Sequence, residues 1–299
     1  MNNNKKTKTI LLICILVLIV ILMNLGCDWP IFFRRNSNLK LLISKEGYSA
    51  FNPVWTPDGN KIYYLMVQQE GYIESYGGQL RVINIDGSND RLVLDGTFGS
   101  LAITQDCSKL SLTCGNIKEG GSLILTDTLG NILDTLSAYP QKVCDVEFNR
   151  TGNTAYYFAY NEGFFKVNFE TGMADTVLPW DIINGFDVWD DSLIIFGGKL
   201  YNLINRNITD YFHLRIYQHA QFLPFSANQI ISATRDKAYI SNLELEKYEE
   251  LDVCPYWNSY ISFPYWSPDG EKIVFSASKM KGDPNRPTNH ELWILEKIE

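Results

Sequence analysis

The 299-residue sequence has few of the residues and motifs from which catalytic and metal sites are usually built. It holds only three histidines (His213, His219 and His290) and 6 cysteines, and no two cysteines are spaced as CxxC. It has no HExxH motif, no phosphate-binding Walker loop and no GxSxG nucleophile turn. These absences favour a protein with no catalytic centre, no metal site and no bound cofactor.

The sequence also lacks an excess of positive charge. It has 26 lysines and arginines against 34 acidic residues, for a net charge of −8, and three of the lysines lie within the first eight residues. Arg34-Arg35 is the only adjacent basic pair after that segment. Because binding to nucleic acid relies on stripes of basic side chains, we expect no nucleic-acid partner.

A long apolar run occurs once, at residues 10–23 ("ILLICILVLIVILM"). Its 14 residues are fewer than the roughly 20 that span a bilayer comfortably, and a lysine-rich segment precedes them. Both features are typical of a secretory signal, and an uncleaved N-terminal anchor is the alternative. In either case the lysines favour a cytoplasmic N-terminus and an exported body.

The run ends on "LGC", which resembles the bacterial lipobox. The resemblance implies that Cys27 is lipidated and becomes the first residue of the mature chain, although Asn24 stands where the lipobox has leucine. We expect a signal peptide or membrane anchor over residues 1–27, a linker over 28–38, and one domain over 39–299. That domain would be held on the periplasmic or cell-surface side of a bacterial membrane.

Two nearly identical phrases lie about 200 residues apart: "PVWTPDGNKIYYL" at 53–65 and "PYWSPDGEKIVFSAS" at 264–278. Proline, aspartate and glycine suit successive positions of a tight turn, and β-branched and aromatic residues flank it. Each phrase therefore predicts a β-hairpin. Asp58 and Asp269 are interpreted as turn-forming residues rather than metal ligands.

Weaker copies lie between the two phrases. The last apolar residue before each turn is Trp55, Ile103, Phe148, Trp189, Phe225 and Trp266, at intervals of 48, 45, 41, 36 and 41 residues. A period of this length with hairpin chemistry is typical of a β-propeller. We expect an all-β fold with six blades of four strands, with a seven-bladed ring as the alternative.

The chain order predicts how the ring closes. Six third strands but only five fourth strands follow the hairpins, and "LKLLIS" at 39–44 precedes the first hairpin. We expect this N-terminal strand to complete the last blade, so that no sheet edge stays open.

The motifs "WTPDGNKIYYL" and "WSPDGEKIVFS" resemble the PDG repeats of TolB-type six-bladed propellers, which are also found in prolyl oligopeptidases. The resemblance covers most of 39–299 and is specific for the fold but not for an activity. The additional domains of those families have no counterpart in this sequence, so we do not expect their activities to transfer. The resemblance implies a propeller-only bacterial lipoprotein.

The links between blades each contain an aromatic residue, and in this topology they share one face of the ring. They predict a binding mouth, with packing between blades as the alternative interpretation. The residues are Tyr48, Phe98, Tyr139, Trp180, Tyr217, Tyr256 and Trp257. The same geometry predicts a disulfide between Cys114 and Cys144, with buried free thiols as the alternative.

Acidic residues near the expected innermost strands, Asp145 and Asp190-Asp191, are interpreted as solvated turn carboxylates, with a channel cation as the alternative. The three histidines are interpreted as surface or turn residues. The sequence therefore favours a membrane-anchored module that binds a protein or peptide. A glycan-binding or glycan-cleaving propeller and a small-molecule enzyme with a channel metal remain alternatives.

Overall fold

The computed structural model describes residues 36–68, 78–116, 120–136, 143–159, 162–178, 185–196, 199–210, 219–234, 237–243, 248–256, 259–280 and 287–296. The apolar run 10–23 and Cys27 lie outside these ranges. Within them, no helix is long and apolar enough to cross a membrane. The regular structure described consists of 23 β-strands.

Seven strands form one sheet, in the order β2-β3-β4-β5-β6-β7-β8. They are β2 (Tyr48–Trp55), β3 (Lys61–Gln68), β4 (Gly78–Asn84), β5 (Arg91–Ile103), β6 (Leu110–Asn116), β7 (Gly120–Thr126) and β8 (Ile132–Leu136).

The other strands form four sheets of four, and every strand pairing among the described residues is antiparallel. One sheet holds β9 (Val143–Phe148), β10 (Thr154–Ala159), β11 (Gly163–Asn168) and β12 (Ala174–Leu178). The next holds β13 (Phe186–Trp189), β14 (Leu193–Phe196), β15 (Lys199–Asn202) and β16 (Ile208–Asp210). A third holds β17 (Ala220–Leu223), β18 (Ser226–Ala233), β19 (Ala238–Asn242) and β20 (Tyr248–Leu251). The last joins β21 (Ser259–Trp266), β22 (Ile273–Met280) and β23 (Pro287–Leu295) to β1 (Leu39–Ile43).

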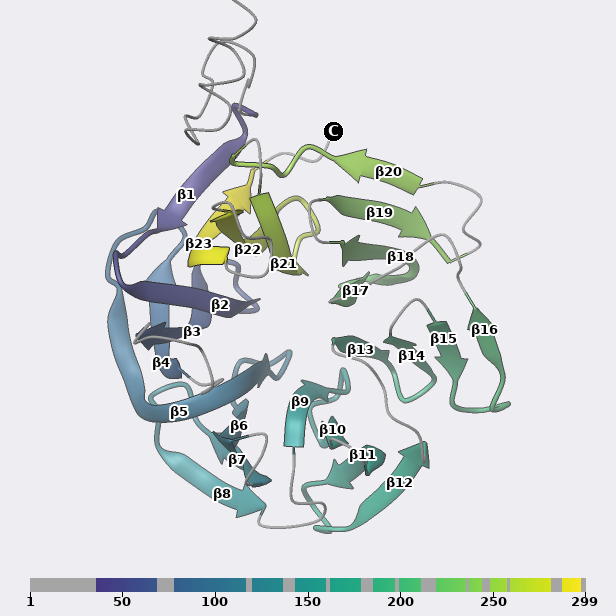
Figure 1. Ribbon diagram of the computed structural model, residues 1–299. Coiled ribbons are helices and arrows are strands. Elements are labelled where there is room, and N and C mark those ends of the chain that lie inside the picture. Colours follow the sequence, from purple (N-terminus) through teal and green to yellow (C-terminus); the bar gives the residue numbers. More distant parts are fainter. Residues whose placement is uncertain are drawn as a thin grey trace, which may run out of the picture.

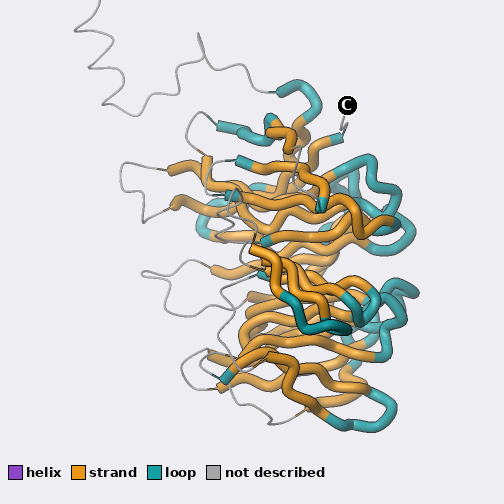
Figure 2. The backbone as a smooth tube through the Cα atoms, turned by 90° about the vertical axis from the view of Figure 1, so that its right-hand side faces the viewer, coloured by secondary structure: helices purple, strands orange, loops and turns teal. Residues whose placement is uncertain are grey.

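The sheets follow one another around a centre, and β9, β13, β17 and β21 are the innermost strands of the four-stranded sheets (Figure 1). The ring closes where β1 pairs with β23, with Leu39 opposite Leu295 and Leu41 opposite Trp293. The predicted closure by the N-terminal strand is therefore confirmed, with β1 ending at Ile43. Seen from the side, the strands cross a flattened ring and the described turns gather along one face (Figure 2).

Strand β5 explains why two of the expected four-stranded units form one sheet. Its first residues, beginning at Arg91, pair with β4, and its last residues, up to Ile103, pair with β6. Phe98 is paired with both strands, opposite Gly78 and Cys114. Because the 13-residue strand continues without a break from an outer position to an inner one, the two hydrogen-bond ladders join.

The PDG turns have the geometry that their sequence predicts. Thr56 donates its hydroxyl to the Asp58 carboxylate at 2.5 Å, and this carboxylate also accepts the Asn60 N–H at 3.0 Å. Gly59 has φ of 68°, a left-handed conformation that favours glycine. These hydrogen bonds hold the pKa of Asp58 below its ordinary value. The second copy repeats the pattern through Ser267, Asp269 and Gly270.

The core consists of apolar layers between neighbouring sheets. Trp55, Ile62 and Tyr64 of the first sheet pack with Val274 and Ile294 of the last. Equivalent layers fill the other interfaces. Since each sheet buries both faces, the ring is stabilised by contacts between sheets as well as within them.

Candidate functional site at the centre of the ring

Five hydrogen bonds join neighbouring innermost strands at the centre of the ring, and we call this set the belt. Each bond links a side chain of one inner strand to the neighbouring inner strand, so the belt ties neighbouring sheets together at the centre. Its members are Asn52 Nδ2 to Gly99 O (2.9 Å), Ser100 Oγ to Asp145 (2.5 Å), Phe222 N to Asp187 (2.7 Å), Trp266 N to Gln221 (2.7 Å) and Trp55 Nε1 to Tyr265 O (3.1 Å).

Bulges in the inner strands help to form the belt. Asn52 and Phe263 each lie three residues before the tryptophan of a PDG phrase, and both have positive φ, 48° and 52°. Pairing with the adjacent strand is interrupted at both positions. A bulge redirects the side chain that would otherwise alternate regularly, and it often occurs at functional sites.

Three carboxyl groups lie at one side of the belt, on β9 and β13. Asp145 accepts the Ser100 hydroxyl and the Val146 N–H, and Glu147 accepts the Tyr265 hydroxyl at 2.5 Å from across the ring. Asp145 and Glu147 each keep 9% of their surface exposed, so the group is not fully sealed.

Burial favours the protonated forms of Glu147 and Asp187. Burial raises the pKa of Glu147 well above its ordinary value, and the nearby Asp187 and Asp145 charges raise it further. Burial also raises the pKa of Asp187 to about 7, although the Phe222 and Val188 N–H groups and Arg150 oppose that change.

His219 lies close enough to Asp145 to feel the charge of that carboxylate. Its ring centroid is 4.2 Å from that of Phe263. Burial lowers the pKa of His219, although the charge of Asp145 opposes this change. The lowered pKa favours the neutral imidazole at pH 7. His219 therefore contributes little positive charge to the centre.

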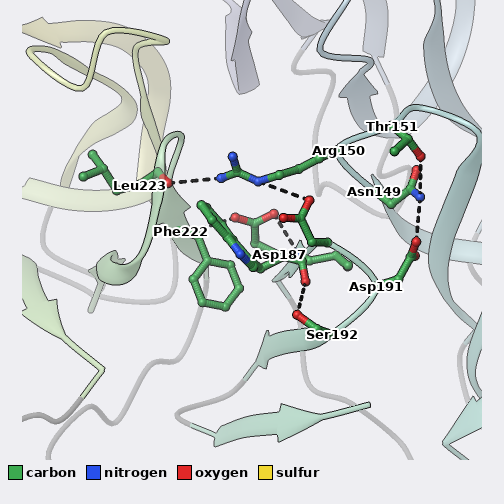
Figure 3. A network of polar contacts seen from close by, with 11 residues as sticks. Asn149, Arg150, Thr151, Asp187, Asp191, Ser192, Phe222 and Leu223 are labelled. Atoms are coloured by element: carbon green, nitrogen blue, oxygen red, sulfur yellow. Dashed lines mark hydrogen bonds and ion pairs between the residues drawn. The ribbon is translucent and has the colours of Figure 1, made fainter. Parts of the chain in front are cut away.

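Arg150 lies at the turn between β9 and β10, beside Asp187 (Figure 3). Its guanidinium stacks over the Trp189 ring at 3.2 Å, donates to Leu223 O at 3.3 Å and lies 3.9 Å from Asp190. Burial lowers the pKa of Arg150, while Asp190 and Asp187 raise it. The arginine thus joins three sheets at the edge of the centre.

The neighbouring turn at Asp190 and Asp191 has positive φ at both residues, 46° and 51°. Asp190 is exposed, as predicted for a turn carboxylate. Asp191 accepts the Tyr156 hydroxyl at 2.6 Å and the Asn149 amide at 3.0 Å, so it also ties two sheets together. The prediction for Asp145 was wrong, because this residue is buried in the belt.

The predicted ring-mouth aromatics divide into two groups. Tyr139, Trp180, Tyr217 and Trp257 lie outside the described residues. Of the others, Phe98 is 3% exposed within the layer between two sheets, which supports the packing interpretation. Tyr256 donates to Glu291 at 2.5 Å and packs edge-on against Trp293, and Tyr48 is half-buried beneath Lys45.

Cys114 and Cys144 are not joined by a disulfide in the structure. Cys114 packs with Leu110 and Leu112 in one apolar layer, whereas Cys144 packs with Tyr156 and Phe158 in another. The predicted pairing overlooked strand alternation, because neighbouring strands can present adjacent cysteines to opposite faces.

Of the three histidines, His219 and His290 are half-buried. Burial lowers the pKa of His219 and lowers that of His290 to about 4. His213 lies outside the described residues. Within the described ranges, no group of three or more His, Cys, Asp or Glu side chains is arranged to hold a metal ion.

Sequence reasoning did not find Glu147, Asp187, Arg150 or Tyr265. One signal was available: Asp187 and Glu147 are acids within short apolar runs that precede predicted turns. Acidic residues at such positions are costly unless they face a polar centre.

Comparison with known proteins supports the fold. No family model matches the chain, and no curated protein matches it. Among solved structures, it is similar to the RRP9 WD40 repeats (TM-score 0.64, 10% identity, covering 88% of this chain and 98% of that one). It is also similar to U3-55K (TM-score 0.64, 9% identity, covering 88% and 100%).

The chain folds as a β-propeller. At 10% identity or less, the similarity identifies the architecture and not a shared activity. The propeller fold predicted from the hairpin period is therefore confirmed, and the belt lies around the propeller axis.

Proposed function

We propose that this chain is an exported, membrane-anchored β-propeller that binds a protein or peptide partner. The observation that carries the proposal is the closed ring with partly exposed polar and aromatic side chains around its axis, including Asp187, His219 and Phe263. Because a rigid ring of this kind is already ordered before binding, it loses little conformational entropy when a partner docks. The similar WD40-repeat structures are consistent with this use of the fold.

The proposal includes six blades of the TolB type. Strand β5 serves as the fourth strand of one unit and the first of the next, so the seven-stranded sheet counts as two blades. The four remaining sheets then complete six. The PDG turns at Asp58 and Asp269 support the TolB-type assignment through their shared hydrogen-bond pattern.

Export and anchoring rest on the sequence of residues 1–27. We propose that Cys27 carries the lipid and that the propeller lies outside the cytoplasmic membrane of a bacterium. Metabolic labelling with a lipid analogue tests this step, since a Cys27→Ser variant should lose the label while a Cys14→Ser control keeps it. Equal labelling of both variants would contradict lipidation at Cys27.

Crosslinking in intact cells, followed by purification and mass spectrometry, tests partner binding. We expect one specific protein to be recovered with the wild-type chain, and its absence over repeated experiments would refute the proposal. The glycan-binding alternative has less support, because Phe98 and Tyr256 are engaged in packing. A nucleic-acid partner is disfavoured by the net charge of −8.

A further inference from the structure

Among the residues that the structure describes, the carboxyl groups at the belt outnumber the positive charges that act on them. Asp145 and Glu147 come from β9 and Asp187 from β13, while the facing groups include His219, which directly precedes β17, and the Tyr265 hydroxyl from β21. The charge of Arg150 lowers the pKa of Asp187, but the Arg150 guanidinium is already stacked on Trp189 and donates to Leu223 O. If Glu147 and Asp187 ionise, the described groups around them supply too little positive charge to balance them.

The belt also holds a buried acceptor with no hydrogen-bond donor. Asn52 is 8% exposed, and its side-chain oxygen has no partner, although its nitrogen donates to Gly99. The next residue, Ser100, donates to Asp145. The unused oxygen thus belongs to the same stretch of the belt as the acids, where an unpartnered buried acceptor is costly.

These acceptors suit a cation with several N–H donors. The three acids lie on two strands and form no metal-binding group within the described residues. A planar guanidinium, with five N–H donors, can instead reach acceptors that lie in different directions. The half-buried rings of Phe51 and Phe263, 6.4 Å apart, add aromatic faces that favour a cation.

We propose that the belt binds the side chain of a basic residue, with arginine preferred, presented by a protein partner. This inference rests on the proposed partner-binding function and names the chemistry that the partner must offer at the axis. The guanidinium is held by Asp187 and Glu147 and donates to the Asn52 oxygen.

Protons and the basic side chain compete for the same acids. Because burial raises the pKa of Asp187 to about 7, this acid is partly protonated in the unbound protein at neutral pH. A bound cation favours the ionised form, so binding releases protons and strengthens as the pH rises through 7.

Titration of the purified full-length chain with N-acetyl-arginine amide tests the proposal, with isothermal calorimetry and thermal unfolding as readouts. N-acetyl-citrulline amide, which has nearly the same shape but no charge, is the ligand control. We expect binding and a rise in Tm with the arginine compound alone. Affinity in Asp187→Asn should fall about ten- to a hundredfold, because a buried charge partner is lost.

Asp175→Asn is the matched control variant, because Asp175 is an exposed carboxylate on outer strand β12. It should bind like the wild type. Equal binding of the citrulline compound, unchanged affinity in Asp187→Asn, or no arginine-specific effect up to millimolar concentration would each overturn the proposal. If Asp187→Asn does not fold by circular dichroism, Glu147→Gln replaces it, with the same expected loss.

The titration and the crosslinking experiment test the arginine site and the partner-binding function separately. A partner crosslinked equally by the wild type and by Asp187→Asn would leave partner binding intact and overturn the basic side chain at the belt. Binding of the arginine compound without any recovered partner would support the site and contradict the broader function.

Discussion

Ring closure by β1 can be tested by comparing two adjacent leucines. Leu42 is 6% exposed and packs in the layer with Trp55, Tyr64, Val274 and Ile294, which joins the first and last sheets. Leu41 is 42% exposed and points to the opposite side of the same strand. Truncation of Leu42 therefore removes contacts across the closing interface, whereas truncation of Leu41 removes few contacts.

The expected magnitudes follow from burial. A Leu→Ala change at a well-packed site costs about 2–5 kcal/mol, through lost transfer free energy and the cavity left behind. We expect Leu42→Ala to lower the free energy of unfolding by about 2–4 kcal/mol. The cost is below the upper limit because β1 is an edge strand of the last sheet and can partly relax. Leu41→Ala should cost less than about 1 kcal/mol, as is usual for a surface change.

Equilibrium urea unfolding, followed by tryptophan fluorescence, measures both values, and Trp293 lies opposite Leu41 in the β1–β23 pairing. The two variants share the same strand and the same chemical change, so their difference isolates burial. Equal costs for the two variants, or no cost for Leu42→Ala, would refute the docking of β1 as the closing strand.

Three further predictions concern the centre and the turns. Burial raises the pKa of Asp187 from 3.8 to about 7, so the folded chain binds a proton that the unfolded chain releases. Stability should therefore fall between about pH 4 and pH 7, by at most about 4 kcal/mol. The gain of Asp187→Asn over the wild type should grow from pH 5 to pH 8 in urea unfolding, and parallel pH profiles would contradict it. Cys107 has φ of 57° at the turn position where the PDG turns have glycine. Cys107→Gly should therefore raise the free energy of unfolding by about 1 kcal/mol, while Cys107→Ala should not. Equal thermal stability of the two variants would count against backbone strain at this position. Tyr265→Phe removes the hydroxyl that donates to buried Glu147 and should cost about 1–3 kcal/mol, whereas an unchanged unfolding midpoint would show that this bond contributes little.

Most of the fold could be predicted from local chemistry. Proline, aspartate and glycine set the turns at Asp58 and Asp269, and alternating apolar residues set the strands on both sides. The repeat period led to the propeller, and the imbalance between third and fourth strands led to the closing strand at Leu39–Ile43. The joining of two units through β5 was not predicted, because a continuous ladder depends on how far one strand bends and not on its composition.

The sequence by itself determined the hairpins, their period and the manner of closure, since these depend on backbone preferences within a few residues. Only the tertiary structure decided which side chains meet at the axis. Asp145 and Asp187 are 42 positions apart, and Tyr265 reaches Glu147 across 118 positions. Whether a carboxyl group is solvated or buried beside another depends on how separate sheets pack. No local sequence pattern specifies the distance between side chains on different sheets.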